Sequence, residues 1–186
     1  MVITLIGYRG CGKTSVARLL AERLGWDWID ADVVIEQNAG QSIKEIFDTE
    51  GEPGFRQRER ETIHQLLQQD QLILASGGGA ILNEQTRTDM QASGPVVWLN
   101  APAETLAERI EADALSQSQR PSLTGKSISA EVAEVLEQRE PLYRETATVI
   151  IDAAASSPEQ IARKIEQVIT EQQQHKHSEQ DKGNLS

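Results

Sequence analysis

Cysteine is nearly absent from this chain of 186 residues, in which Cys11 is the single residue of its type. One cysteine forms no intrachain disulfide, so the fold depends on its hydrophobic core and the composition fits a reducing compartment. Long apolar runs are missing as well, since no stretch reaches the roughly 20 residues that a membrane-spanning helix requires. The apolar start at residues 2–6 lacks the basic flank of a signal peptide. We therefore expect a cytoplasmic protein that does not act at a membrane.

Positive charge is also scarce, with 18 basic residues against 29 acidic residues and a formal net charge of -11. Such a surface repels nucleic acids and anionic membranes, so we expect neither as a partner. An anionic substrate would need a local basic pocket. The positions of the few arginines are therefore informative about function.

The chain does contain a regular alternation of apolar strands and amphipathic helices, within a length typical of one domain. Strands are expected at residues 2–6, 28–29, 72–75, 95–99 and 148–151. Helices are expected at 14–24, 42–49, 55–69, 83–92, 102–112, 129–139 and 158–172, with Gly51 separating the second helix from the third. This alternation predicts an α/β fold whose mostly parallel sheet is covered on both faces. Residues 1–172 would form one domain, and the polar residues 173–186 a disordered tail.

Residues 7–14 read G-Y-R-G-C-G-K-T and match the phosphate-loop pattern G-x-x-x-x-G-K-[ST] between a predicted strand and a predicted helix. The glycines let backbone N–H groups point at phosphate, and the helix N-terminus adds partial positive charge. A plain glycine-rich turn is the less favoured interpretation, and Cys11 is expected to be a small filler rather than a redox group. The expected ATP-binding residues of the loop are Gly10, Cys11, Gly12, Lys13, Thr14 and Ser15.

Two carboxylates, Asp30 and Asp32, follow the second predicted strand. Ligands of parallel α/β sheets bind at the carboxyl ends of strands, so both side chains are expected near the phosphate loop. One carboxylate could hold Mg²⁺ through water while the other accepts the proton of a hydroxyl group. Alternatively, Asp32 merely caps a helix that begins at Val33.

Two further features suit an anionic acceptor. Arg56 and Glu59 lie three residues apart and share one helix face, either as a solvated ion pair or with Glu59 orienting Arg56 toward a carboxylate. Gly77-Gly78-Gly79 forms either a plain loop or a turn against which a ligand presses. Arg120 and Arg139, taken singly, are equally compatible with a surface position.

Together these features resemble the shikimate kinase family. The shared pattern comprises the phosphate loop, D-x-D at 30–32, F-R-x-x-E at 55–59, G-G-G at 77–79, R-P at 120–121 and R-E-P-L-Y at 139–143. The motifs occur in the family's order and span residues 1–172. The phosphate loop is common to many nucleotide-binding families, whereas the combination of the other motifs is much more specific.

The resemblance implies a three-layer αβα fold with a five-stranded parallel sheet and a mobile lid at about residues 114–126. It implies transfer of the ATP γ-phosphate to the 3-hydroxyl of shikimate, in the pathway to chorismate and aromatic amino acids, by a monomer that uses Mg²⁺. The implied catalytic residues are Lys13, Asp32 and Arg120, and the implied metal positions are Thr14 and Asp30. The implied acceptor residues are Asp32, Arg56, Gly77, Gly78, Gly79 and Arg139. Arg109 and Arg120 would contact ATP, but the adenine-contacting arginine that the family often has near residues 156–158 is missing.

Two other functions remain open from the sequence. A kinase for another small acceptor, such as gluconate or a nucleoside monophosphate, would share the phosphate loop but would not require Arg56, the triple glycine and Arg139 together. A non-catalytic binding module would be favoured by loss of Lys13, Asp32 or Arg56, and all three are present.

Overall fold

The computed structural model describes the backbone of residues 1–113 and 127–183 and the side chains of residues 1–113 and 127–171. The expected lid at 114–126, with Arg120, lies outside the described residues. Among the described helices, none combines the length and the apolar character that crossing a membrane would take.

A parallel sheet of five strands forms the centre of the fold. Its strands are β1 (Val2–Ile6), β2 (Asp27–Asp30), β3 (Leu72–Ala75), β4 (Val96–Asn100) and β5 (Val149–Asp152). They lie in the order β2-β3-β1-β4-β5, and every neighbouring pair is parallel. The predicted five-stranded parallel sheet is therefore confirmed, and the carboxyl ends of all strands meet at one edge.

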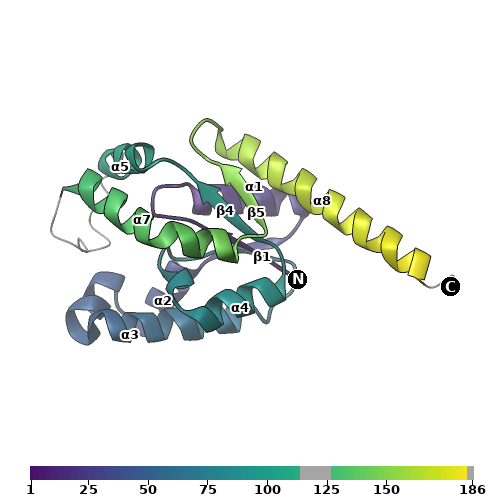
Figure 1. Cartoon of the computed structure of the whole chain (residues 1–186). Helices are drawn as coiled ribbons and strands as arrows, with labels where there is room; N and C mark the ends of the chain where they lie inside the picture. The colour runs from purple at the N-terminus through teal and green to yellow at the C-terminus, as the bar shows by residue number, and fades with distance from the viewer. Residues whose placement is uncertain (114–126, 184–186) are drawn as a thin grey trace.

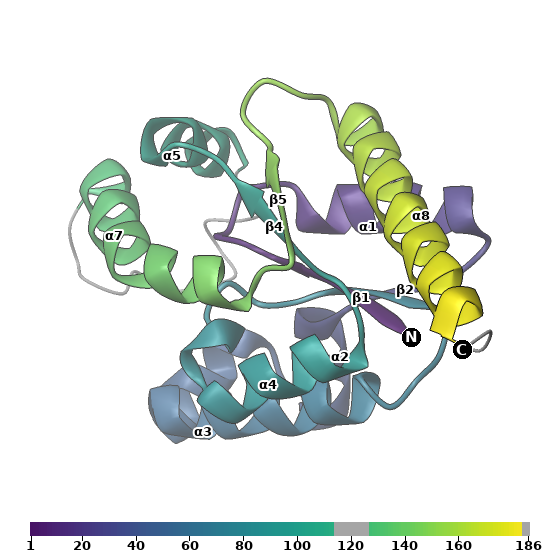
Figure 2. The same cartoon turned by 45° about the vertical axis from the view of Figure 1, so that its right-hand side comes forward.

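Helices cover both faces of the sheet (Figures 1 and 2). On one side α1 (Lys13–Leu24) packs against α8 (Pro158–Gly183), and α5 (Ala103–Ala112) packs against the first part of α7 (Ile128–Thr146), whose later residue Tyr143 packs with the helices of the opposite side. The other side carries α2 (Ala31–Ala39), α3 (Ile43–Leu66), the short 3₁₀ helix η1 (Ala80–Leu82) and α4 (Glu84–Ser93). This arrangement confirms the predicted three-layer αβα architecture.

Alternation of side chains along the strands divides the core into two layers. In β1, Ile3 and Leu5 belong to a cluster with the buried faces of α1 and α8, whereas Val2 and Ile6 belong to a cluster with α3 and α4. The central strands β1, β3 and β4 are buried on both faces, which explains why they read as nearly continuous apolar runs, whereas the edge strands β2 and β5 keep exposed side chains such as Trp28 and Ile150. The two core layers pack on opposite faces of the sheet and so fix the position of the loops at its carboxyl edge.

The break predicted at Gly51 is confirmed. Residues 43–66 run as two helical pieces that meet at Gly51, whose backbone has φ 69° and ψ −177°. This conformation is essentially restricted to glycine, because a Cβ atom would clash there. The capping box of Ser42 and Glu45 begins the first piece, also as expected from the sequence. The kink sets the direction of the second piece, which carries Arg56.

Two helices are longer than predicted. Helix α7 continues to Thr146 past Pro141, although the sequence predicted its end at Arg139. The buried side chains of Tyr143 and Thr146 anchor this last part on the sheet, and their packing outweighs the cost of a proline within the helix.

Helix α8 continues to Gly183 and projects beyond the body of the domain (Figure 1), whereas its end was expected near Gln172, before a disordered tail. The added segment, residues 173–183, contains three glutamines, two lysines and one glutamate, which have high helix propensity. Residues 173–183 are too polar to contribute to a hydrophobic core, but their composition is still compatible with a helix.

Candidate active site

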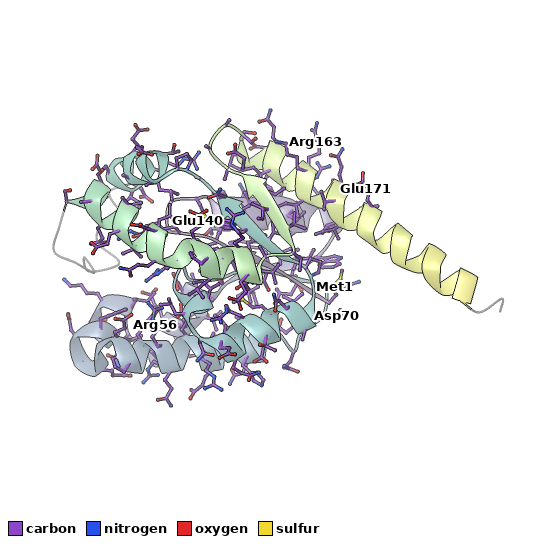
Figure 3. The ribbon with its side chains drawn as sticks, in the orientation of Figure 1. Met1, Arg56, Asp70, Glu140, Arg163 and Glu171 are labelled. Atoms are coloured by element: carbon purple, nitrogen blue, oxygen red, sulfur yellow. The ribbon has the colours of Figure 1, made fainter. Side chains whose placement is uncertain are left out.

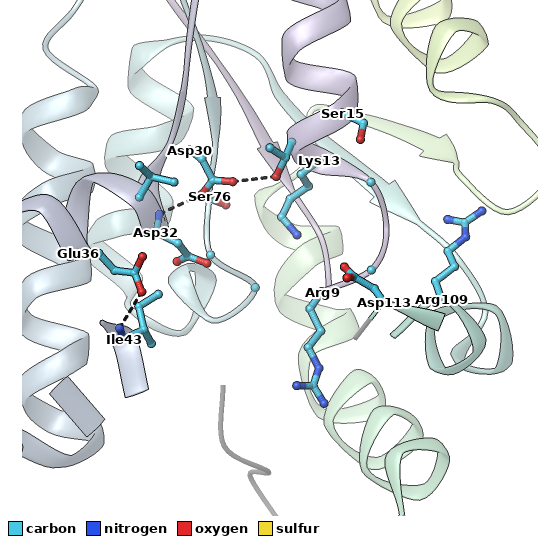
Figure 4. A pocket seen from close by; sticks show the side chains of 16 residues that line it. Arg9, Lys13, Ser15, Asp30, Asp32, Glu36, Ile43, Ser76, Arg109 and Asp113 are labelled. Carbon is cyan, nitrogen blue, oxygen red and sulfur yellow. Dashed lines mark hydrogen bonds between the residues drawn. The ribbon is translucent and has the colours of Figure 1, made fainter. Parts of the chain in front are cut away.

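A cavity of about 560 Å³ opens at the carboxyl edge of the sheet. The loops after β1, β2 and β3 all contribute to it, as expected for a ligand site of a parallel α/β fold. Figure 4 shows the side chains that line it, from the phosphate loop on one side to the start of α2 on the other. The lining residues with a predicted role are Gly10, Gly12, Lys13, Thr14, Ser15, Asp30, Asp32, Gly77, Gly78 and Arg109.

The phosphate loop connects β1 directly to α1, as its sequence pattern predicted. Gly12 caps α1 with φ 95°, a left-handed conformation that glycine adopts without steric cost. Lys13 Nζ lies within the curl of the loop and donates to the carbonyl oxygens of Gly7 at 2.7 Å and Tyr8 at 3.0 Å. The loop therefore presents a helix N-terminus and an ammonium group to the cavity, which together favour a bound phosphate.

Cys11 is buried beneath the same loop, with only 1% of its surface exposed. Its Sγ atom lies 3.6 Å from Lys13 Nζ, and it packs in the core cluster of α1. These surroundings agree with the expected role as a small filler.

A hydrogen-bonded chain joins the phosphate loop to the end of β2 (Figure 4). Thr14 Oγ1 donates to Asp30 Oδ2 at 2.7 Å, and the backbone N–H of Asp32 donates to Asp30 Oδ1 at 3.0 Å. Asp30 is thus the N-cap of α2, which begins at Ala31. The alternative that Asp32 caps a helix beginning at Val33 is wrong, and the Asp32 side chain instead faces the cavity.

The environment of Asp30 disfavours its negative charge. Burial raises the pKa of the Asp30 carboxyl above its ordinary value, and the charge of Asp32 raises it further, against the opposing hydrogen bond from Thr14. A divalent cation beside these oxygens would instead favour the charged carboxylate and lower the pKa of Asp30.

The donor set at this position fits a hard divalent cation. A hydroxyl and a carboxylate supply oxygen ligands, and a metal bound mainly through phosphates and water needs few protein ligands. Accordingly, residues 1–113 and 127–171 contain no cluster of three or more His, Cys, Asp or Glu side chains suited to hold a metal by themselves.

Arg56 stands on α3 (Figure 3) and is held by two carboxylates. Its Nη1 donates to Glu59 Oε2 at 2.6 Å, and its Nε and Nη2 both donate to Glu52 Oε1. Burial disfavours the charged guanidinium, but Glu59 and then Glu52 more than compensate and raise the pKa of Arg56. Because the Glu59 side chain is only 3% exposed, the pair is not the solvated ion pair that the sequence left open.

The triple glycine contacts both Arg56 and Arg139. A Cβ atom on Gly79 would lie 2.3 Å from Arg56 Nη1, so the guanidinium packs where a side chain would otherwise stand. Arg139, 9% exposed within α7, donates from Nη1 to the carbonyl of Gly78 at 3.2 Å. The large cavity is lined by Gly77 and Gly78 of the turn but not by Gly79. The two arginines do not line the cavity either, and they contact the turn from outside it.

Arg9 lines the cavity, although the sequence predicted no role for it. This residue occupies a variable position of the phosphate-loop pattern and forms an ion pair of 3.1 Å with buried Glu131 of α7. Its positive charge within an otherwise acidic chain is the signal that could have identified it.

A second cavity of about 250 Å³ lies on the other side of the phosphate loop. Arg109 borders it and donates from Nη2 to the carbonyl of Ala153 at 2.9 Å. Arg109 therefore connects α5 to the loop after β5. The lining consists of Gly10, Cys11, Gly12, Val16, Arg109, Ala153, Ser156, Pro158 and Ile161.

Comparison with known proteins agrees with this geometry. The family model described as shikimate kinase matches residues 9–170. A shikimate kinase of Rhodopirellula baltica is 44% identical over 161 residues, which cover 87% of this chain and 86% of that protein. A structure of shikimate kinase from Acinetobacter baumannii in complex with shikimate has a TM-score of 0.86 at 38% identity, covering 92% of this chain and 93% of that one. A gluconokinase from Sinorhizobium meliloti, with a TM-score of 0.56 at 20% identity over 87% of each chain, shares the fold alone. The chain belongs to the shikimate kinase family.

Proposed function

We propose that this ATP-dependent kinase transfers the γ-phosphoryl group of ATP to the 3-hydroxyl of shikimate, giving shikimate 3-phosphate and ADP. One observation carries the proposal: Asp32 and the glycine turn face the phosphate loop across a single cavity. This glycine turn also contacts Arg56 and Arg139. The two arginines would supply the local positive charge that binding of a carboxylate requires in an acidic chain.

The nucleotide side of the site would act by positioning and charge stabilisation, which phosphoryl transfer needs more than covalent chemistry. Backbone N–H groups of residues 10–15 would hold the phosphates, and Lys13 would neutralise the γ-phosphate. Arg109 would border the adenine in the smaller cavity. Arg120 would add charge to the phosphates from the lid at 114–126.

On the acceptor side, Arg56 and Arg139 would bind the carboxylate and so orient the 3-hydroxyl in line with the γ-phosphate. Asp32 would accept the hydrogen bond of that hydroxyl and take its proton during transfer. Gly77, Gly78 and Gly79 would let the acceptor approach the backbone closely.

The divalent metal would be Mg²⁺, held by Thr14 Oγ1 directly and by Asp30 through water. When bound with ATP, it supplies charge neutralisation at the β- and γ-phosphates. Asp30 would keep Thr14 oriented toward it through their hydrogen bond.

A coupled ADP-release assay against a panel of acceptors tests the function. Shikimate, gluconate, a nucleoside monophosphate and a shikimate analogue without its carboxylate should be compared, with phosphorus NMR identifying the phosphorylated hydroxyl. We expect turnover with shikimate alone, at its 3-hydroxyl, and none in a folded Lys13→Met variant. Preferred turnover of another acceptor, or binding of shikimate without turnover, would contradict the proposal.

We further propose that the protein acts in the cytoplasm as a monomer, with residues 1–172 as the functional domain. The single cysteine is free and buried, and a fold without a disulfide supports this location. Sedimentation of the full chain with and without ATP measures the oligomeric state, and a dimer would contradict the proposed monomer.

A further inference from the structure

The carbonyl oxygen of Gly78 receives two donors from α7. Tyr143 Oη donates to it at 2.5 Å and Arg139 Nη1 at 3.2 Å. Residues four apart share one face of a helix, so α7 directs both side chains at the same carbonyl. Of the two, only Arg139 has a proposed role in binding the acceptor.

Tyr143 is held rigidly. Its side chain has no exposed surface and stacks on Trp98 of β4, with ring centroids 5.7 Å apart and planes 17° apart. Burial raises the pKa of the Tyr143 phenol above its ordinary value, so the group stays protonated and able to donate. A buried hydroxyl that lost its acceptor would be costly, which makes the bond to Gly78 persistent.

Gly78 lies between α7 and the phosphate loop. A Cβ atom on Gly78 would lie 3.6 Å from Tyr143 Oη, 3.4 Å from the carbonyl oxygen of Gly7 and 3.6 Å from the backbone nitrogen of Arg9. Because the C=O and N–H of a trans peptide point in opposite directions, fixing the Gly78 carbonyl also directs the N–H of Gly79 away from α7. The hydroxyl of Tyr143 therefore sets the peptide plane on which Arg56 packs.

We propose that Tyr143 is a positioning residue for the acceptor, which fixes the glycine turn through the Gly78 carbonyl. By supplying the shorter of the two hydrogen bonds, it keeps Arg139 from being the sole anchor of the turn. The inference rests on the proposed function, because it assumes that the turn and its two arginines bind the acceptor.

The variant Tyr143→Phe keeps the ring and its stack but removes the donor. The KM for shikimate should rise roughly threefold to tenfold, the range that one neutral hydrogen bond gives, while the KM for ATP stays within about twofold. The matched control is Thr146→Val. Thr146 is equally buried in α7, but its hydroxyl donates to the carbonyl of Leu142 at 2.6 Å rather than to Gly78.

Thr146→Val should lower the thermal unfolding temperature without changing either KM. An unchanged shikimate KM in Tyr143→Phe, an equal rise in both KM values, or an equal shift in the control would overturn the positioning role. If Tyr143→Phe does not fold, Trp98→Phe weakens the stack instead and should raise only the shikimate KM, to a smaller extent; no such rise would overturn the inference. Absence of shikimate turnover in the wild-type protein would overturn the proposed function and this inference together.

Discussion

At the scale of a single residue, Arg56 shows how an acidic chain can keep one edge of a buried guanidinium accessible to an anion. Its guanidinium lies between Glu52 and Glu59, whose side chains differ greatly in exposure, at 52% and 3%. Glu59 is therefore a permanent partner that fixes one edge of the guanidinium. Glu52 lies in solvent, where an ion pair contributes little, so the edge that it occupies remains accessible to a substrate carboxylate.

Replacing either acceptor arginine should weaken binding of the acid specifically. We expect Arg56→Ala and Arg139→Ala each to raise the shikimate KM roughly tenfold to a hundredfold, the loss of about 1.5–3 kcal/mol that a charge-assisted contact gives. The KM for ATP should change much less. Arg58→Ala is the control, since Arg58 is paired with Glu50 and stands on the same helix away from the turn. Steady-state kinetics with a shikimate analogue lacking its carboxylate completes the test, because that analogue should be insensitive to both substitutions.

A methyl group on Gly79 should displace Arg56 without breaking the fold. The added Cβ would meet the far end of a flexible side chain, so the guanidinium moves and the backbone remains. We expect Gly79→Ala to raise the shikimate KM while the unfolding temperature changes little. In an Arg56→Ala background the same substitution should have almost no further effect on KM, as a double-mutant cycle measures. Additive effects in the two backgrounds would show that Gly79 does not act through Arg56.

Local sequence predicted the residues that act within one loop but not those that meet across the fold. The phosphate loop and the Asp30–Asp32 pair could be found because their chemistry requires fixed spacing beside a strand. Tyr143 and Gly78, by contrast, are 65 positions apart, and Arg9 and Glu131 are 122 apart. No local pattern records which turn of α7 reaches which carbonyl, since that depends on the packing of the whole sheet.

At the scale of the element, a helix kink sets the direction of the piece of α3 that carries Arg56. The two pieces of α3 meet at Gly51, and only the second carries Arg56. A glycine after a predicted helix end was enough to predict the interruption. The sequence did not reveal that a second helical piece continues without an intervening loop, because backbone geometry of this kind leaves no side-chain signal.

The kink should be sensitive to any side chain. Gly51→Ala forces an L-residue into a glycine-only conformation and should lower the free energy of unfolding by about 1–3 kcal/mol. Gly40→Ala is the control, because Gly40 ends α2 in the milder left-handed helical conformation, at φ 63° and ψ 20°, with no atom near its Cβ position. Urea unfolding of both variants measures the difference. An equal or greater loss in Gly40→Ala would contradict the special role of Gly51.

At the scale of the whole molecule, the described buried face of α8 runs from Ile161 to Ile169. The last buried side chain that the structure describes in α8 is Ile169, which belongs to the same core cluster as α1. Arg23 of α1 also pairs with Glu166, so α8 is attached to the domain by contacts that precede residue 170. The described core contacts of α8 therefore lie within residues 158–171.

Truncation separates the domain from the extension. A chain ending at Gln172 should keep the kcat, both KM values and the unfolding temperature of the full chain, because it retains every described core contact of α8. A chain ending at Val168 loses Ile169 and should be destabilised by about 1.5–3 kcal/mol, the free energy of burying one such side chain. Both truncations keep the Arg23–Glu166 pair, so they differ in apolar burial rather than in that charge contact. Comparable stability loss in the two chains would mean that residues 173–186 contribute to the fold, and the domain would then extend past residue 172.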